Sequence, residues 1–454
     1  MQKVHARQAL LPTGWAAEIC VTLQNGEITG VDKAVADGAP IVDVLLPAPV
    51  NLHSHAFQRA MAGLTETRGP DPQDSFWTWR AIMFRFLDRL TPDQVEAIAA
   101  QVFMEMLESG YGAVAEFHYV HHDVGGHPYA NLSEMAERIV AAAQTAGIGL
   151  TLLPVLYMSG GCDGRALQGG QRRFGNDVTQ FHALCDAASR SLKAGFDDAR
   201  LGHAAHSLRA VSPDALKDVL EMTADGPIHM HLAEQVAEVD EVIHHLGARP
   251  VEWLLENAPV GPRWCLVHCT QMSDAETQGL AATGAVAGLC PITESSLGDG
   301  IFNGTSYHAA GGRFGVGSDS NIHVAIWEEL ATLEYSQRLR DRNRAAMATD
   351  KQSTGRRLFD AVTQAGAQAA GRPCGQIAQG HAADLIAVST DNAYLCNRTG
   401  DTVLDSLIFT GRGRECVTDV WSAGRHMVQN GRHTKRDHIE STFKAVVEDL
   451  GQSL

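Results

Sequence analysis

The chain has 454 residues, 44% of them hydrophobic and 20% charged, a globular composition whose length predicts one large and one smaller domain. The formal net charge of −17 argues against binding to nucleic acid or to an anionic membrane, because the summed field repels both. No apolar run reaches about 18 residues, so no membrane span is expected. The first residues lack the apolar core of a secretory signal, and the nine cysteines contain no CxxC pair. Both features predict a cytoplasmic protein with reduced thiols.

Both ends of the chain carry the pattern of antiparallel strands. Residues 19–31 alternate apolar and polar positions around Asn25-Gly26, which is a strong hairpin signal. Near the other end, residues 383–388 are typical of a strand. Residues 417–427 follow, and a turn is expected at Asn430-Gly431.

The middle of the chain alternates short apolar runs with amphipathic helices. The runs cover residues 48–52, 113–117, 150–156, 200–205, 227–232, 264–268, 285–290 and 313–317. Capping sequences at Thr91, Ser212 and Ser273 mark helix starts, two of them followed by proline at the first helical position. Eight strands separated by helices predict an α/β protein with a (β/α)8 TIM-like barrel, whereas fewer and longer units would indicate a doubly wound sheet.

Ligand-type side chains stand at the ends of several predicted strands. His53 and His55 end the first run, and side chains two apart on a strand share a face. This triplet alone is a weak signal, but His231, His268 and Asp319 follow the fifth, sixth and eighth runs. All strand C-termini of a barrel converge on one mouth, so packing is a poor explanation for polar residues at four of them. The pattern therefore indicates a metal site.

With these motifs, the sequence resembles the amidohydrolase superfamily. The matching segments are residues 49–55 (PVNLHSH), 231–234 (HLAE), 267–268 (VH), 317–320 (GSDS) and 380–385 (GHAADL). The resemblance implies an amidohydrolase barrel at residues 46–365. It also implies a small β-sandwich domain built from both chain ends, residues 1–45 and 366–454, with a C-terminal helix.

The resemblance further implies one zinc ion per chain, with water as its reactive ligand. The ligands at the matched positions are His53, His55, His231 and Asp319. Superfamily members with two ions use a lysine on strand four, and residues 200–206 contain none, so one metal is expected. His229 shares a face with His231, but Glu234 completes the family's H-x-x-E pattern with His231. His229 is therefore expected to be a core histidine.

The chemistry implied is replacement of a C–N nitrogen by water. Asp319 accepts the proton of the water, His268 holds the attacking group or stabilises charge, and Glu234 protonates the leaving nitrogen. The alternative for Glu234 is an acid at the start of a helix, where a carboxylate is favourable in its own right.

Segments beside the strands indicate the substrate class. Gln58 follows the first strand, Tyr119 the second, His206 and Arg209 the fourth, and Arg80 is expected on the loop after the first. They resemble segments of superfamily members that release ammonia from a small, linear amidine with two carboxylates. An acidic protein needs local cations for such a dianion, and the arginine fork suits a carboxylate. Alternatively, both arginines form surface salt bridges, or Arg80 caps a helix.

Two other functions stay open. An aminohydrolase of a purine or triazine-like ring is expected to favour aromatic stacking and neutral amides over paired arginines. A non-catalytic scaffold of the same fold is expected to have lost metal ligands, all of which are present here. The resemblance suggests a homodimer, and the ligand types also suit iron or manganese. No role is expected for His121, His122, His127 and His323.

Overall fold

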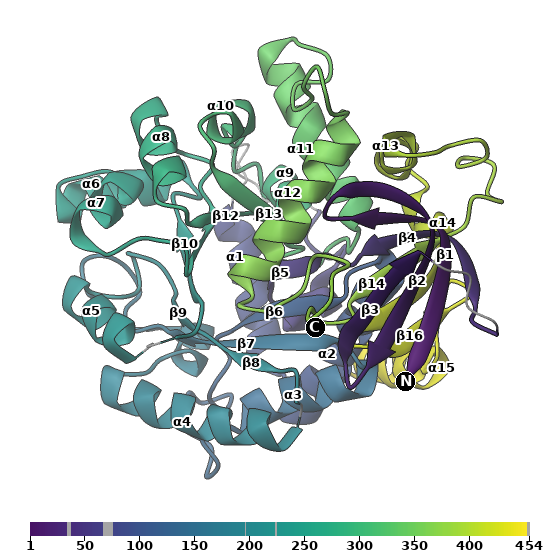
Figure 1. Cartoon of the computed structure of the whole chain (residues 1–454). Coiled ribbons are helices and arrows are strands. Elements are labelled where there is room, and N and C mark those ends of the chain that lie inside the picture. Colours follow the sequence, from purple (N-terminus) through teal and green to yellow (C-terminus); the bar gives the residue numbers. More distant parts are fainter. Residues whose placement is uncertain (34–37, 67–75, 196, 223–224, 452–454) are drawn as a thin grey trace.

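Parallel strands alternate with helices through the middle of the chain and form a barrel (Figure 1). The computed structural model describes residues 1–33, 38–66, 76–195, 197–222 and 225–451. The barrel strands are β5 (Val50–Ser54), β6 (Ala113–His118), β7 (Gly149–Leu156), β8 (Arg200–Leu201), β9 (His203–Ala205), β10 (Ile228–Leu232), β11 (Trp264–His268), β12 (Val286–Leu289) and β13 (Arg313–Val316). The fourth predicted run holds both β8 and β9, and each of the other runs overlaps one strand. The predicted (β/α)8 barrel is therefore confirmed.

Helices surround these strands on the outside of the barrel (Figure 1). They are α1 (Phe76–Leu87), α2 (Pro92–Ser109), α3 (Glu134–Ala146), α4 (Val178–Gly195), α5 (Pro213–Met222), α6 (Val236–Leu246), α7 (Pro250–Asn257), α8 (Asp274–Ala282), α9 (Pro291–Leu297), α10 (Gly304–Ala309), α11 (Ile326–Asp341) and α12 (Thr354–Ala369). The predicted starts at Thr91, Ser212 and Ser273 are confirmed. At the first of them, the Gln94 backbone N–H donates to Thr91 Oγ1 (3.3 Å) and so satisfies one of the unpaired donors of the first turn.

The barrel closes where β13 meets β5, and this junction differs from the other strand pairs. In the described residues its only ladder contact is a single parallel bridge between Ser54 and Asp319. The backbones approach closely, because a Cβ at position 317 would lie 2.6 Å from the backbone N of His53. Gly317 is therefore needed to bring the end of β13 against the end of β5.

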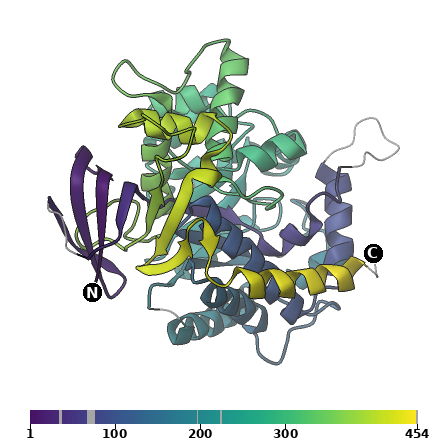
Figure 2. The ribbon, with the colours of Figure 1, turned by 90° about the vertical axis from the view of Figure 1, so that its right-hand side faces the viewer.

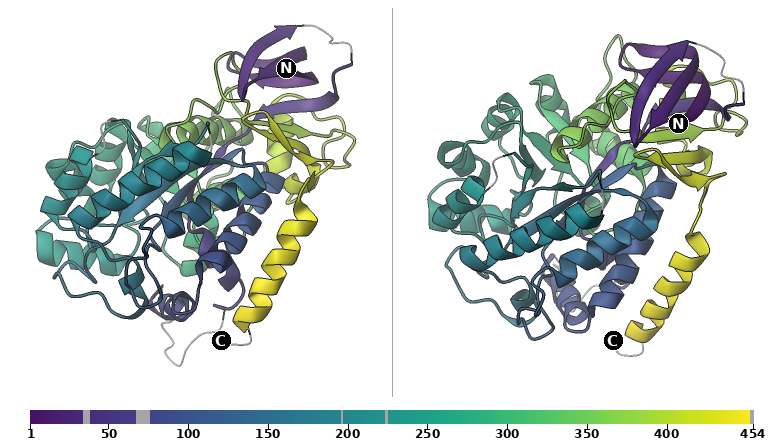
Figure 3. Two further views of the ribbon diagram at one scale, coloured as in Figure 1. Left: turned by 90° about the horizontal axis from the view of Figure 1, so that it is seen from below. Right: turned by 60° about the horizontal axis from the view of Figure 1, so that its bottom comes forward.

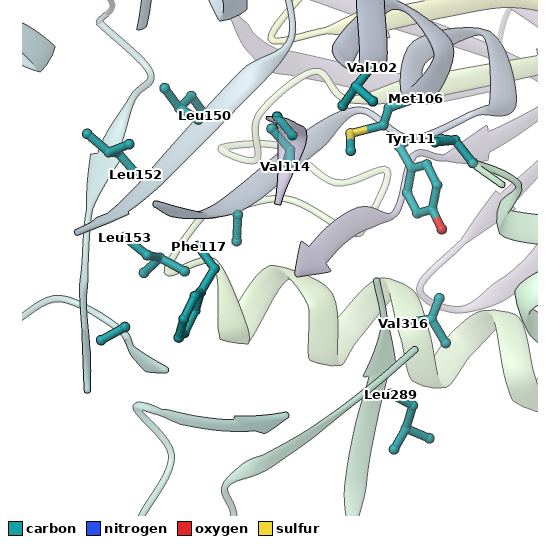
Figure 4. Close-up of a cluster of buried hydrophobic side chains, with 14 of the residues drawn as sticks. Val102, Met106, Tyr111, Val114, Phe117, Leu150, Leu152, Leu153, Leu289 and Val316 are labelled. Carbon is teal, nitrogen blue, oxygen red and sulfur yellow. The ribbon is translucent and has the colours of Figure 1, made fainter. Parts of the chain in front are cut away.

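The core lies between the strands and the surrounding helices. Figure 4 shows part of it, where Val102 and Met106 of α2 lie with Val114 of β6 and Leu150 of β7. All four side chains are fully buried. Because β6 and β7 are buried over their whole length, they are mostly apolar and do not alternate with exposed polar residues.

A second, smaller sheet is made from both chain ends. Its hydrogen-bonded order is β17-β16-β15-β14-β4-β1-β2-β3. These strands are β1 (Gln2–Leu11), β2 (Gly14–Gln24), β3 (Glu27–Lys33), β4 (Ile41–Pro47), β14 (Leu385–Val388), β15 (Val417–Ser422), β16 (Arg425–Gln429) and β17 (Arg432–His433). The two ends meet where β4 pairs antiparallel with β14. The turns predicted at Asn25-Gly26 and Asn430-Gly431 are confirmed, with positive φ at all four residues.

The remaining helices complete the C-terminal region. They are α13 (Asp401–Phe409), α14 (Gly413–Cys416) and α15 (Arg436–Gly451). From the small sheet, α15 extends along the barrel and packs against α2 (Figures 2 and 3). The expected domain boundaries stay a prediction, and α12 crosses the one at 365/366. Among the described residues, no helix combines the length and apolarity needed to cross a membrane.

Candidate metal centre and substrate cavity

Three histidines and an aspartate meet at the C-terminal ends of the barrel strands. His53 lies on β5, His55 directly after it, His231 on β10 and Asp319 after β13. Their ligand-type atoms all lie within 4.8 Å of one another, and all four residues are buried. Asp319 Oδ1 lies 3.4 Å from His53 Nε2 and 3.3 Å from His55 Nε2, and the Nε2 atoms of His53 and His231 are 3.1 Å apart. The residues predicted to share a metal are thus together.

Backbone carbonyls orient two of these imidazoles. His55 Nδ1 lies 3.1 Å from the carbonyl oxygen of Phe117, and His231 Nδ1 lies 3.2 Å from that of His206. A carbonyl oxygen can only accept, so Nδ1 carries the hydrogen in each ring and Nε2 presents its lone pair to the cluster. Burial lowers the pKa of both histidines, to about 3 for His55, which keeps them neutral. Neutral imidazole nitrogens and a carboxylate are donor types that divalent metal ions bind.

His229, the second candidate on β10, points elsewhere. Its Nε2 lies 2.8 Å from the carbonyl oxygen of Ala369 in α12, and burial lowers its pKa to about 3. It is a neutral core histidine, as predicted.

A chain of buried polar side chains joins the ends of β5 and β13 beside the single bridge between Ser54 and Asp319. Asn51 Nδ2 donates to Ser318 Oγ (2.6 Å), and Ser318 Oγ donates to Asn321 Oδ1 (2.6 Å). Asn321 Nδ2 lies 3.0 Å from the carbonyl oxygen of His55 and 3.1 Å from that of Asp319. Sequence reasoning missed this network. These side chains act together with two backbone hydrogen bonds, from the His55 N–H to the Asp319 oxygen (2.9 Å) and from the Asp319 N–H to the His53 oxygen (3.0 Å). Both sets of contacts hold the separation of the strands that precede or carry three of the four ligand candidates.

His268 stands between three carboxyl groups beside this cluster. Its Nε2 lies 3.9 Å from Glu234 Oε1 and 4.0 Å from Asp319 Oδ2, and its Nδ1 lies 3.3 Å from Glu294 Oε1. Burial lowers the pKa of His268, but the carboxylates, Glu234 first, outweigh burial and raise the pKa well above its ordinary value. Burial also raises the pKa of Glu234. Sequence reasoning missed Glu294, although it follows β12 at the same barrel mouth.

The backbone near these strand ends is strained. Ala233, His268 and Asp319 have φ values of 52°, 73° and 45°, in the left-handed region that side chains other than glycine rarely adopt. Such conformations cost free energy and persist where the surrounding structure enforces them, often at functional sites.

A cavity lies over the cluster and opens to solvent, and its empty space together with the open mouth amounts to about 550 Å³. Its lining residues are His55, Gln58, Trp79, Arg80, Met83, Tyr119, Tyr157, Phe174, His206, Arg209, His231, Glu234, His268, Leu297 and Asp319. All five predicted substrate-binding residues belong to this set. Gln58 Nε2 donates to the hydroxyl oxygen of Tyr119 (2.9 Å), and His206 Nδ1 lies 3.0 Å from Ser207 Oγ.

Both predicted arginines reach the cavity. Arg209 forms no ion pair with any described residue, and its buried Nε has no hydrogen-bond partner among them, so it is not part of a surface salt bridge. The carboxylates of Glu238 and Glu234 outweigh burial and raise its pKa.

The expectation that Arg80 lies on a loop is wrong. It lies inside α1, where apolar residues at helical spacing, among them Met83 and Leu87, pack inward. Its Nη2 donates to the Tyr157 hydroxyl (2.9 Å). Residues 67–75, expected to form the rest of that loop, lie outside the described residues.

The histidines expected to have no role do not line the cavity. Two of these histidines follow β6 and contact backbone carbonyl groups. His121 Nε2 lies 3.0 Å from the carbonyl oxygen of Val155, and His122 Nε2 lies 2.7 Å from that of Gly175. His127 and His323 are exposed.

Comparison with known proteins agrees with this geometry. The model of the amidohydrolase family matches residues 44–427, and the chain belongs to this family. It is similar to the formimidoylglutamate deiminase of Pseudomonas aeruginosa, with 48% identity over 455 residues that cover 99% of this chain and 100% of that protein. An amidohydrolase structure from Brucella melitensis superimposes with a TM-score of 0.95 and 49% identity, covering 99% and 100% of the two chains. A zinc-bound adenosine deaminase from Xanthomonas campestris shares the fold alone, with a TM-score of 0.81, 19% identity and coverage of 99% and 98%.

Proposed function

We propose that this chain hydrolyses N-formimidoyl-L-glutamate to N-formyl-L-glutamate and ammonia, a step of histidine degradation in the cytoplasm. The observation that carries the proposal is that Arg80 and Arg209 line the same cavity as the histidine and aspartate cluster. A substrate with a reactive amidine at one end and two carboxylates matches both halves of this cavity. The 48% identity to formimidoylglutamate deiminase over the full length supports the same reaction.

We further propose that His53, His55, His231 and Asp319 hold one zinc ion. Ligands at about 2.0–2.1 Å in tetrahedral geometry lie about 3.3–3.4 Å apart, close to the spacing of these side-chain atoms. When bound, zinc polarises the amidine or lowers the pKa of a water molecule. A second ion is not expected at the neighbouring group of His268, Cys290 and Glu294, because burial raises the Cys290 pKa well above its usual range and keeps the thiol protonated.

Two side chains carry the proton transfers in this proposal, and a third stabilises charge. Burial raises the pKa of Asp319, but hydrogen bonding and charge from His53 outweigh burial and keep the carboxylate ionised, so that Asp319 can take a proton from the attacking water. The raised pKa of Glu234 favours a protonated carboxyl group, which suits proton donation to the nitrogen that leaves as ammonia. A cationic His268, lying between Glu234 and Asp319, stabilises negative charge that develops on the oxygen.

Substrate binding is assigned to the other side of the cavity. Arg209 and Arg80 would each pair with a carboxylate, which the low local dielectric strengthens. Tyr119, Gln58 and His206 would complete the hydrogen bonds. Gln58 supports this role, because its Oε1 is buried without a partner among the described residues.

The test is ammonia release by purified protein, with zinc measured on the same sample. We expect release from N-formimidoyl-L-glutamate, weaker release from the shorter aspartate analogue, and none from guanine or adenosine. Release from a purine and none from the amidine would overturn the proposal in favour of a ring aminohydrolase. Protein with no metal and no activity on either class would indicate a scaffold.

We also propose that the protein forms a homodimer, as the family resemblance suggests. The dimer is expected in dilute solution without added ligand. Light scattering at several protein concentrations tests it, and a mass near 48.8 kDa throughout would contradict it.

A further inference from the structure

Tyr157 is a buried cavity residue that the preceding proposals leave without a role. It follows β7 directly and is 3% exposed. Its ring packs edge-on against His206 (centroids 4.5 Å apart) and near Phe174 (5.5 Å). These contacts hold the ring so that its hydroxyl group lies at the cavity beside Arg80.

Two nitrogen donors point at the Tyr157 hydroxyl oxygen. Arg80 Nη2 lies 2.9 Å from it, and Gln171 Nε2 lies 3.2 Å from it. A guanidinium group can only donate. The Gln171 amide is oriented by its other end, because its Oε1 accepts from the backbone N–H of Gln168 (3.2 Å). Both contacts are therefore N–H donors to the phenol.

This arrangement decides where the hydroxyl hydrogen of Tyr157 points. A phenol oxygen has one O–H and two acceptor sites, and here both acceptor sites are used. The hydrogen must therefore go to a third group, yet no described residue accepts it. A buried donor without an acceptor costs free energy, which favours an acceptor that arrives with a ligand.

We propose that Tyr157 donates its hydroxyl hydrogen to a substrate carboxylate, the one that Arg80 also binds. The arrangement favours an anionic acceptor, because the Tyr157 O–H and the Arg80 guanidinium both present hydrogens and Arg80 carries a positive charge. Tyr157 is then a specificity-determining residue, since an amidine lacking that carboxylate leaves the Tyr157 hydroxyl hydrogen without an acceptor. This inference rests on the proposed function and extends it to a residue that binds a substrate carboxylate rather than the reacting amidine.

Tyr157→Phe removes the hydroxyl and keeps the ring. We expect kcat/KM for N-formimidoyl-L-glutamate to fall about 10- to 100-fold, mainly through KM, because this contact is made equally in the ground and transition states. Zinc content and melting temperature are expected to match the wild type. The control is Tyr307→Phe, since Tyr307 is buried outside the cavity and its hydroxyl lies 3.5 Å from the Ala285 carbonyl oxygen.

Analogues that each lack one carboxylate separate donation from a general structural effect. N-formimidoyl-4-aminobutyrate lacks the α-carboxylate and N-formimidoyl-2-aminobutyrate lacks the distal one. We expect Tyr157→Phe to lose activity on one analogue and to equal the wild type on the other. Equal losses on both, or an unchanged KM for the full substrate, would overturn the proposal.

A binding measurement distinguishes failure of this inference from failure of the proposed function. Wild-type protein that releases no ammonia from N-formimidoyl-L-glutamate contradicts the function. Calorimetry with glutarate, a dicarboxylate without an amidine, then still tests Tyr157 in the zinc-loaded protein. A dissociation constant raised about tenfold or more in Tyr157→Phe supports carboxylate binding, and an unchanged constant overturns it.

Discussion

His268 Nδ1 lies 3.3 Å from Glu294 Oε1, and the same oxygen accepts the backbone N–H of Cys290 (2.8 Å). The carboxylate is thus held in place by the start of α9 and in turn orients the imidazole beside the metal centre. Glu294 helps to raise the pKa of His268, so it also stabilises the imidazolium.

Glu294→Gln should therefore lower kcat about 10- to 100-fold, because it removes a hydrogen bond to a charged group. Removing the carboxylate lowers the pKa of His268, so the alkaline decline of activity should begin at a lower pH. The pH profile of kcat, with zinc quantified, measures both effects. A profile that only scales down without shifting would contradict the stated role of Glu294.

Glu234→Gln should reduce kcat by about 10²- to 10⁴-fold, because an amide cannot protonate the leaving nitrogen. Zinc content should stay at the wild-type level, since Glu234 is not among the proposed ligands. Glu256→Gln is the matched control, because Glu256 is exposed on α7. Near-normal turnover by zinc-loaded Glu234→Gln removes Glu234 from the mechanism.

Arg209→Met should lower kcat/KM for the dianionic amidine by about 100-fold, since a buried charge pair with a carboxylate is lost. The loss is expected in full-length, zinc-loaded protein with an unchanged melting temperature. Steady-state kinetics with metal analysis measures it. If the value is unchanged, Arg209 does not contact the substrate.

Asn321→Ala should weaken zinc binding about 10- to 100-fold, as is usual when groups that orient metal ligands are removed. Its amide holds the backbones of His55 and Asp319, which belong to different strands. Competition with a chromophoric chelator measures the affinity without reference to turnover. Asn303→Ala is the control, because Asn303 bonds to the Met272 oxygen and Thr277 outside the metal centre; equal affinities in both variants would contradict the prediction.

His118 is one of the buried histidines through which the protein should lose stability in mild acid. This histidine is buried at the end of β6, and desolvation lowers its pKa to about 4. The unfolded chain takes up the proton near the ordinary value of about 6.5, so stability falls as pH drops from about 6.5 toward 4 and is unaffected above that range. At pH 5 the loss from this group is about 2 kcal/mol.

Denaturant unfolding at pH 7.5 and pH 5.0 tests this effect. His118→Gln should reduce the difference between the two pH values, whereas His127→Gln should not, because His127 is exposed. An equal difference in both variants would show that another group causes the acid sensitivity.

The sequence alone determined the barrel strands and their order, although the helix α1 around Arg80 was expected to be a loop. Apolar runs such as residues 150–156 and the capping sequence at Thr91 act over a few residues, so their signals are complete in a short window. The candidate metal ligands were predictable for a related reason. Barrel strands end at one mouth, so their places in the strand order brought His53, His55, His231, His268 and Asp319 together as candidates. The resemblance to the amidohydrolase superfamily then implied which four of them are the ligands.

Only the tertiary structure decided the contacts between separate elements. Arg80 meets Tyr157 across 77 positions of sequence, Glu294 meets His268 across 26, and Asn321 meets His55 across 266. No local pattern encodes such pairs, because each depends on the distance and angle between two packed elements. Where β13 meets β5, the described ladder is reduced to two backbone hydrogen bonds, from the His55 N–H to the Asp319 oxygen (2.9 Å) and from the Asp319 N–H to the His53 oxygen (3.0 Å). Side-chain contacts such as those of Asn321 add to them, and packing of this kind is a property of the whole fold.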